Sequence, residues 1–228
     1  MNSLARWQQA QLAESEFWSG IATADQEILR VMESSCRRAA RVQEWIGDTP
    51  KVCLEVGVGG LGVGVIGFLQ AFPVRIGIDP LPLVRLQCGE AVRGFVDSLR
   101  CRAVVGSGES LPVRDQSVDL VVCCNVLDHV RDADAVLAEI RRVLRPGAAL
   151  FLEVDTFSLG SLVKWHCWTK HLRAAETLVR AHPYRFLESA VLALLERHRM
   201  EVVHLTGHTR WSAVFGKSRP SVFLAVRR

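Results

Sequence analysis

Short apolar runs alternate with amphipathic segments through the middle of the chain. The apolar runs are rich in Val, Leu and Ile and have the length of buried strands; they cover residues 52–56, 74–78, 102–105, 118–123 and 148–154. Helix-like spacing of apolar residues marks the segments 61–72, 83–99 and 133–144, the last ending before Pro146 and Gly147. Apolar strands that alternate with helices predict a parallel sheet covered on both faces. The pattern therefore predicts an α/β fold with a doubly wound, Rossmann-like sheet.

The two ends of the chain depart from this alternation. Residues 1–48 are expected to be helical, with one continuous apolar stripe over 21–46. Near the C-terminus, a helix at 186–198 precedes two strands, 201–205 and 221–226, which are expected to pair antiparallel. The sheet then has seven strands, mostly parallel, with an antiparallel last strand. We expect one domain with four parts: an N-terminal helical cap (1–48), a cofactor-binding core (50–155), a lid insertion (156–185) and a C-terminal helix and strand pair (186–228).

Composition narrows the class of protein. The 228 residues carry a net charge of +4 with basic residues spread along the chain, which argues against a nucleic-acid groove. The seven cysteines form no C-x-x-C pair, as expected in a reducing compartment. The N-terminus lacks the order of a signal peptide, and the longest apolar stretch, 56–68, is shorter than the ~20 residues that cross a bilayer. We expect a cytoplasmic protein with no membrane span and no nucleic-acid partner; the oligomeric state stays open.

A glycine-rich loop, CLEVGVGGLGVG at 53–64, follows the first strand. Gly57, Gly59 and Gly62 spell G-x-G-x-x-G, and Asp79 ends the second strand, where a carboxylate can accept both ribose hydroxyls of an adenosine. Glu55 separates two interpretations. Beside a pyrophosphate an extra anion is unfavourable, whereas S-adenosylmethionine carries a sulfonium and an ammonium and no phosphate. A third interpretation is that Glu55 caps the following helix or pairs with a structural base.

An ordered series of motifs follows this loop. It consists of GSGESLP at 106–112, SVDLVV at 117–122, NVLDHV at 125–130 and LRPG at 144–147. Together with the glycine loop, the series resembles the class I S-adenosylmethionine-dependent methyltransferases, especially the small-molecule branch that includes ubiquinone and menaquinone biosynthesis enzymes. The resemblance implies S-adenosylmethionine as cofactor, a small-molecule acceptor and methyl transfer to oxygen, nitrogen or carbon. It also implies a set of cofactor-binding residues: Glu55, Gly57, Gly59, Asp79, Pro80, Gly108, Glu109 and Asn125.

Three positions depart from the family pattern. Leu61 stands where the family has its third glycine, so the loop is expected to differ in shape. Ser107 replaces the aspartate that usually touches the adenine amino group, which leaves Gly108 and Glu109 to flank the ring through backbone contacts. Ala148 replaces a glycine of the last motif, without expected consequence.

Candidates for the chemistry lie after the fourth core strand and in the insertion. His129, with Asp128 beside it, is the candidate general base, against the alternative that it packs and hydrogen-bonds locally. The segment Asn125-x-x-Asp128-His129 holds only one carboxylate, so no metal is expected. In the lid, Asp155, Trp165 and His166 are the candidate acceptor-binding residues, and a helix that packs on the sheet is the alternative.

Three other functions stay open at this stage. An NAD-dependent oxidoreductase would explain the glycines and Asp79 but would leave Glu55 and the LRPG turn without a role. A non-catalytic S-adenosylmethionine-binding module is suggested by Leu61 and Ser107. An RNA-modifying enzyme rests only on the net charge and the partial N-x-x-D-H motif.

Overall fold

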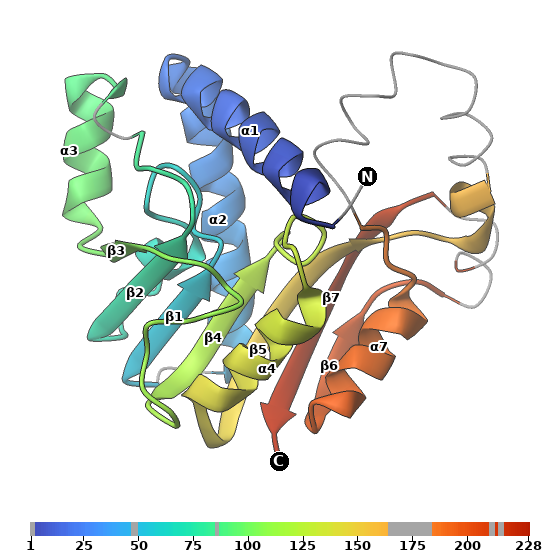
Figure 1. Ribbon diagram of the computed structural model, residues 1–228. Helices are drawn as coiled ribbons and strands as arrows, with labels where there is room; N and C mark the ends of the chain where they lie inside the picture. Colours follow the sequence, from blue (N-terminus) through green and yellow to red (C-terminus); the bar gives the residue numbers. More distant parts are fainter. Residues whose placement is uncertain (1–2, 47–49, 85–86, 164–183, 210–212, 214–216) are drawn as a thin grey trace.

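A central seven-stranded sheet carries helices on both faces in the computed structural model (Figure 1). The structure describes residues 3–46, 50–84, 87–163, 184–209, 213 and 217–228. Its strands are β1 (Val52–Val56), β2 (Val74–Asp79), β3 (Arg102–Val105), β4 (Val118–Cys124), β5 (Leu144–Thr156), β6 (Met200–Thr206) and β7 (Arg219–Arg227). Its helices are α1 (Ser3–Ala22), α2 (Asp25–Ile46), the 3-10 helix η1 (Val65–Phe68), α3 (Glu90–Ser98), α4 (Ala133–Val143) and α7 (Glu188–Arg197).

The strand order is β3-β2-β1-β4-β5-β7-β6. Strands β1 to β5 pair parallel, whereas β7 lies antiparallel between β5 and β6. The predicted seven-stranded, doubly wound sheet with an antiparallel last strand is confirmed. Strand order reverses between β1 and β4, and ligands of such sheets bind beyond the carboxyl ends of the strands at this point.

Alternate residues of β1 face different layers. Leu54 and Val56 belong to a buried cluster with α4 and α7, while Cys53 packs with α2 and η1 on the opposite face. Because side chains alternate along a strand, Glu55 lies on the same side as Cys53. The carboxylate that ends β1 is therefore directed toward α2.

The helix expected at 61–72 is not formed. Only the single turn η1, Val65–Phe68, follows the glycine loop. Three glycines lie within the expected range, and glycine in a helix costs about 1 kcal/mol relative to alanine. The first amides of this turn donate to the carboxylate of Glu55. Apolar periodicity alone does not reveal that a side chain binds the backbone of this segment.

Three other boundaries differ from the prediction. The helix expected at 83–99 begins only at Glu90, and the N-terminal stripe is split into α1 and α2 around Thr23. Strand β5 begins at Leu144, directly after α4, so Pro146 and Gly147 lie inside a strand rather than in a helix-ending turn. A register shift between Val118 and Leu120 on β4 and a φ of 78° at Gly147 accommodate this irregular start.

Candidate cofactor and acceptor site

A cavity of about 690 Å³ opens beyond the carboxyl ends of the parallel strands. This volume lies within the range of small-molecule and cofactor sites. The cavity brings together every predicted site residue that the structure describes: Glu55, Gly57, Gly59, Asp79, Pro80, Gly108, Glu109, Asn125, Asp128, His129 and Asp155. The other two, Trp165 and His166, lie outside the described residues.

Glu55 is buried at the end of β1, with 3% of its surface exposed. Its carboxylate accepts hydrogen bonds from the backbone N–H groups of Val65 at 3.1 Å and Ile66 at 3.0 Å. Burial raises the pKa of Glu55 to about 7, against these two hydrogen bonds and the nearby Arg38, which lower it. The capping role left open by the sequence is therefore present, and the same side chain lines the cavity.

The glycine loop needs its glycines for two reasons. Gly57, Gly59 and Gly62 have φ values of 77°, 76° and 69°, in the left-handed region that other residues rarely adopt. The space is also closed: a Cβ on Gly57 would meet Cγ2 of Val126 at 2.1 Å, and one on Gly59 would meet the Trp18 ring at 2.3 Å. The backbone of the loop thus approaches β4 on one side and α1 on the other.

Asp79 ends β2 on the rim of the same cavity, and only 7% of its surface is exposed. Oδ2 accepts the N–H of Gly59 at 2.7 Å, and Oδ1 accepts the N–H of Leu81 at 2.9 Å. Burial raises the pKa of this carboxyl group, and the two backbone hydrogen bonds oppose the shift. Asp79 therefore ties the glycine loop to the end of β2, and each of its oxygens retains a lone pair for a ligand hydroxyl.

The loop after β3 carries Ser107, Gly108 and Glu109 to the cavity. The Glu109 carboxylate accepts the hydroxyl of Ser107 and, at 2.8 Å, the backbone N–H of Arg131 before α4. The Glu109 side chain thus fastens the loop to the turn preceding α4. The backbone of the same loop is the part that is predicted to contact an adenine. Because the serine also bonds within the loop, it contributes to loop shape where the family has an aspartate.

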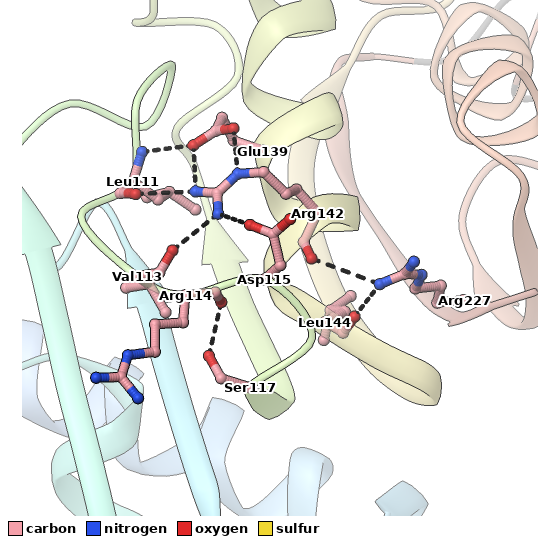
Figure 2. Close-up of polar contacts among 9 residues, drawn as sticks. All are labelled: Leu111, Val113, Arg114, Asp115, Ser117, Glu139, Arg142, Leu144 and Arg227. Atoms are coloured by element: carbon pink, nitrogen blue, oxygen red, sulfur yellow. Dashed lines mark hydrogen bonds and ion pairs between the residues drawn. The ribbon is translucent and has the colours of Figure 1, made fainter.

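Arg142 on α4 anchors the continuation of this loop (Figure 2). Its guanidinium donates to the carbonyls of Leu111 at 2.9 Å and Val113 at 2.8 Å, and it pairs with Glu139 and Asp115. Glu139 in turn accepts the N–H of Leu111 at 2.8 Å. A helix of the sheet-covering layer therefore determines the path of residues 111–115.

The candidate base lies where β4 ends. Asn125 adopts a φ of 54°, which turns the chain away from the strand. His129 follows, with its Nε2 3.5 Å from Oδ2 of the buried Asp128 and its Nδ1 3.4 Å from Oε1 of Glu14 on α1. The imidazole is thus placed between two carboxylates on the cavity wall, a position suited to holding or passing a proton.

The sequence points to Phe17 and Trp18 of the N-terminal helix as closing one side of the site, but not to the other cavity residues of α1 and α2. Residues at helical spacing along α1 line the cavity: Trp7, Gln11, Glu14 and Trp18. On α2, Ser34, Ser35 and Arg38 do the same. The spacing of four, three and four residues in α1 was a usable signal, because it puts one polar and aromatic face on one side of the helix.

Two further structural findings concern metal ions and membranes. Among the residues that the structure describes, no group of three or more His, Cys, Asp or Glu side chains could hold a metal ion. No helix in the described ranges is long and apolar enough to cross a membrane.

Comparisons with known proteins point to methyltransferases. Residues 54–152 match the family model described as "Methyltransferase domain". The chain is 38% identical over 158 residues to the ubiquinone/menaquinone biosynthesis C-methyltransferase UbiE of Xanthomonas campestris pv. campestris, covering 66% of this chain and 58% of that protein. It is 32% identical over 139 residues to an uncharacterized methyltransferase of Mycobacterium sp. (strain KMS), covering 59% and 52% of the two chains.

Solved structures show the same fold. A geranyl diphosphate methyltransferase in complex with SAM aligns with a TM-score of 0.64 at 15% identity, covering 85% of each chain. These matches support a class I S-adenosylmethionine-dependent methyltransferase domain over residues 54–152. The chain spans about half the length of the curated relatives it matches.

The site fits the cofactor of this family better than a dinucleotide. A dinucleotide pyrophosphate uses the amides at the start of the helix after the glycine loop. Here the first amides of η1, those of Val65 and Ile66, already bind the Glu55 carboxylate. The cavity wall is rich in carboxylates and suits a ligand with a net positive charge. The NAD-dependent alternative therefore lacks its phosphate-binding amides in this turn.

Proposed function

We propose that this protein transfers a methyl group from S-adenosylmethionine to a small-molecule acceptor. The observation that carries the proposal is Glu55, which occupies the first amides of η1, directly after the glycine loop, and adds a carboxylate to the cavity. When bound, S-adenosylmethionine supplies a methyl group already activated by the sulfonium. The protein then has mainly to align the acceptor with that methyl group, and orientation of this kind supplies about 7–11 kcal/mol of the barrier.

The described residues divide the cavity into a cofactor part and an acceptor part. Asp79 receives the ribose hydroxyls, and Gly108 and Glu109 lie along the adenine. Glu55 faces the amino-acid end. The space between the ribose and the amino-acid end is bounded by Gly57, Gly59, Pro80 and Asn125. These assignments follow from the common wall that these residues form and from the family pattern.

The acceptor part is lined by α1 and by the turn after β4. Trp7, Phe17 and Trp18 provide aromatic surface, and His129 with Asp128 and Asp155 provides the polar groups. Aromatic walls with a few polar groups favour a flat acceptor with a hydroxyl proton to lose. One relative, UbiE, is named a C-methyltransferase of ubiquinone/menaquinone biosynthesis, so carbon stays beside oxygen and nitrogen as a candidate acceptor atom.

His129 acts as the base in this proposal. Its Nε2 accepts the acceptor proton, while the Glu14 carboxylate, with Oε1 3.4 Å from Nδ1, favours a proton on Nδ1 and so leaves Nε2 available. Bound S-adenosylmethionine would supply the methyl group and retain the sulfur as its leaving group, and His129 holds the proton that the acceptor loses. Proton transfer of this kind contributes about 10²–10⁴-fold to the rate.

The experiment is a pair of calorimetric titrations followed by a transfer assay. The purified protein is titrated with S-adenosylhomocysteine and, separately, with NADH. Binding of the first and not of the second supports the proposal, and the reverse result overturns it. Transfer of tritiated methyl groups from S-adenosylmethionine to a panel of phenols, quinols and amines then identifies the acceptor class. Tight binding with no transfer to any of them supports the non-catalytic binding module instead.

A further inference from the structure

One neutral polar side chain in the cavity wall has no place in the proposed function. Gln11 lies near the middle of α1 and lines the cavity with Trp7, Glu14 and Trp18 of the same helix. Within the part of the chain that the structure describes, no other residue forms a hydrogen bond with its side-chain amide. A glutamine amide offers two N–H donors and a carbonyl acceptor. Gln11 therefore brings unused hydrogen-bonding capacity to the cavity.

The position of Gln11 along α1 indicates which part of a ligand it meets. Near the C-terminal end of α1, Trp18 packs on the glycine loop, where a Cβ on Gly59 would meet its ring at 2.3 Å. Closer to the N-terminus, Oε1 of Glu14 lies 3.4 Å from Nδ1 of His129. Because a helix rises about 1.5 Å per residue, Gln11 lies about 4.5 Å beyond Glu14 and about 10.5 Å beyond Trp18 along the axis. The order along α1 is thus glycine loop, candidate base and Gln11.

The direction from Trp18 to Gln11 also leads away from the adenosine side of the cavity. Figure 1 shows α1 across the carboxyl edge of the sheet, with its C-terminal end on the side of α3. Strand β3 follows α3, and the loop with Gly108 and Glu109, assigned above to the adenine, follows β3. Trp7, about one turn before Gln11, adds an aromatic side chain to the far end of the wall. A ligand group beside Gln11 therefore belongs to the acceptor and not to the cofactor.

We propose that Gln11 is a specificity-determining residue, whose amide binds a second polar group of the acceptor, across the molecule from the atom that receives the methyl group. Its donor and acceptor together match a group that offers both, such as a carboxamide. The group is neutral, because the Glu14 carboxylate, about one turn away, repels an anion. A six-membered ring with substituents on opposite carbons bridges the distance between His129 and Gln11. This inference rests on the proposed function, since it concerns the acceptor of that site.

The test uses three phenols of nearly the same shape: 4-hydroxybenzamide, 4-hydroxyacetophenone and 4-isopropylphenol. Their second substituents offer, in this order, a donor with an acceptor, an acceptor alone, and neither. Ligand NMR measures their affinities for the protein saturated with S-adenosylhomocysteine. The wild type is expected to bind them in this order, with a step of about 3- to 10-fold for each hydrogen bond lost.

Gln11→Leu removes the amide and keeps a residue that favours helix. The variant is expected to bind the three phenols with affinities within about 2-fold of one another, because the hydrogen bonds that rank them are lost. Its affinity for S-adenosylhomocysteine should equal that of the wild type. Gln8→Leu is the matched control, since Gln8 is an exposed glutamine of the same helix, and it keeps the wild-type order and steps.

Every other outcome contradicts the inference in a recognisable way. A wild type that binds the three phenols equally, or binds none of them, overturns it without any variant. A Gln11→Leu variant that keeps the wild-type order overturns it too. A loss of affinity for S-adenosylhomocysteine in Gln11→Leu would assign Gln11 to the cofactor or to the fold, and so overturn its role toward the acceptor. A wild type that does not bind S-adenosylhomocysteine would overturn the proposed function itself, before any phenol is added.

Discussion

The backbone N–H of Ile66 donates to the carboxylate of Glu55 at 3.0 Å, and so an internal anion occupies the start of the turn after the glycine loop. In dinucleotide-binding sheets this place belongs to a phosphate. The chain therefore keeps the glycine-rich geometry of a nucleotide site while changing the charge of the ligand that it favours. This single contact separates the two interpretations that the glycine pattern alone leaves open.

Glu55 predicts a pH-dependent stability. Its pKa is raised from 4.5 to about 7 by burial, so the folded state binds its proton more tightly than the unfolded state. The stabilisation from this group is complete below pH about 4.5 and is lost as pH rises through 7. The loss is about 3 kcal/mol of unfolding free energy. Urea unfolding at pH 5 and pH 8 measures it.

The matched variant is Glu55→Gln, which has the same shape and does not titrate. Only the pH-dependent part is compared, because the amide also changes the hydrogen bonds to Val65 and Ile66. The wild type should lose more stability between pH 5 and pH 8 than the variant. Identical pH profiles for the two proteins would show that Glu55 does not titrate in this range.

Gly59→Ala is expected to damage the site more than the fold. The φ of 76° costs a residue with a Cβ about 1–2 kcal/mol, and the Cβ would also meet the Trp18 ring at 2.3 Å. We expect at least a 10-fold loss of affinity for S-adenosylhomocysteine, measured by calorimetry. Gly94→Ala in α3 has nothing within 4 Å of its Cβ and should keep the affinity while gaining about 0.5–1 kcal/mol in stability. Equal affinities for both variants would contradict the close approach of the loop.

Arg142→Met should affect the adenosine end of the ligand. It removes the donors to the carbonyls of Leu111 and Val113 and the pair with Glu139, at a cost of about 1–3 kcal/mol in stability. Because the loop at 106–109 is continuous with this segment, affinities for S-adenosylhomocysteine and 5′-methylthioadenosine should fall by the same factor. Arg141→Met, one residue earlier on α4, is the control. A fall confined to the ligand that carries the amino-acid tail would contradict this role.

His129 and Glu14 should influence turnover and not cofactor binding. With an acceptor that the transfer assay identifies, His129→Gln is expected to lower kcat by about 10²–10⁴. Glu14→Gln is expected to lower it less, because the imidazole remains and loses only the partner of its Nδ1. Calorimetry with S-adenosylhomocysteine checks that the cofactor site is intact. Full turnover by His129→Gln would leave His129 with local packing alone.

The core of the fold could be predicted from the sequence because burial on both faces makes strands apolar throughout. Residues 52–56, of which 53–56 are buried, have the same bounds in the prediction and in the structure. The helix after the glycine loop could not be predicted in the same way. The Glu55 carboxylate binds the amides of this turn from ten residues earlier in the chain. A pattern of apolar residues does not record such a contact.

In the candidate site, too, some residues could be predicted from the sequence and others could not. Residues at strand ends, such as Glu55 and Asp79, could be predicted because the carboxyl ends of parallel strands meet at one edge of the sheet. Glu14 and Arg38 could not be predicted as site residues, because their position in the cavity wall depends on how α1 and α2 pack over that edge. Their pairing with His129 and Glu153 spans more than a hundred residues of sequence, which no local pattern records.

A crystal structure of the protein with S-adenosylhomocysteine tests the central claim most directly. The account predicts that the homocysteine end lies beside Glu55, that the ribose hydroxyls bind Asp79 and that the adenine lies along Gly108 and Glu109. A ligand whose amino-acid end lies away from Glu55, or a diphosphate bound at the amides of Val65 and Ile66, would contradict it.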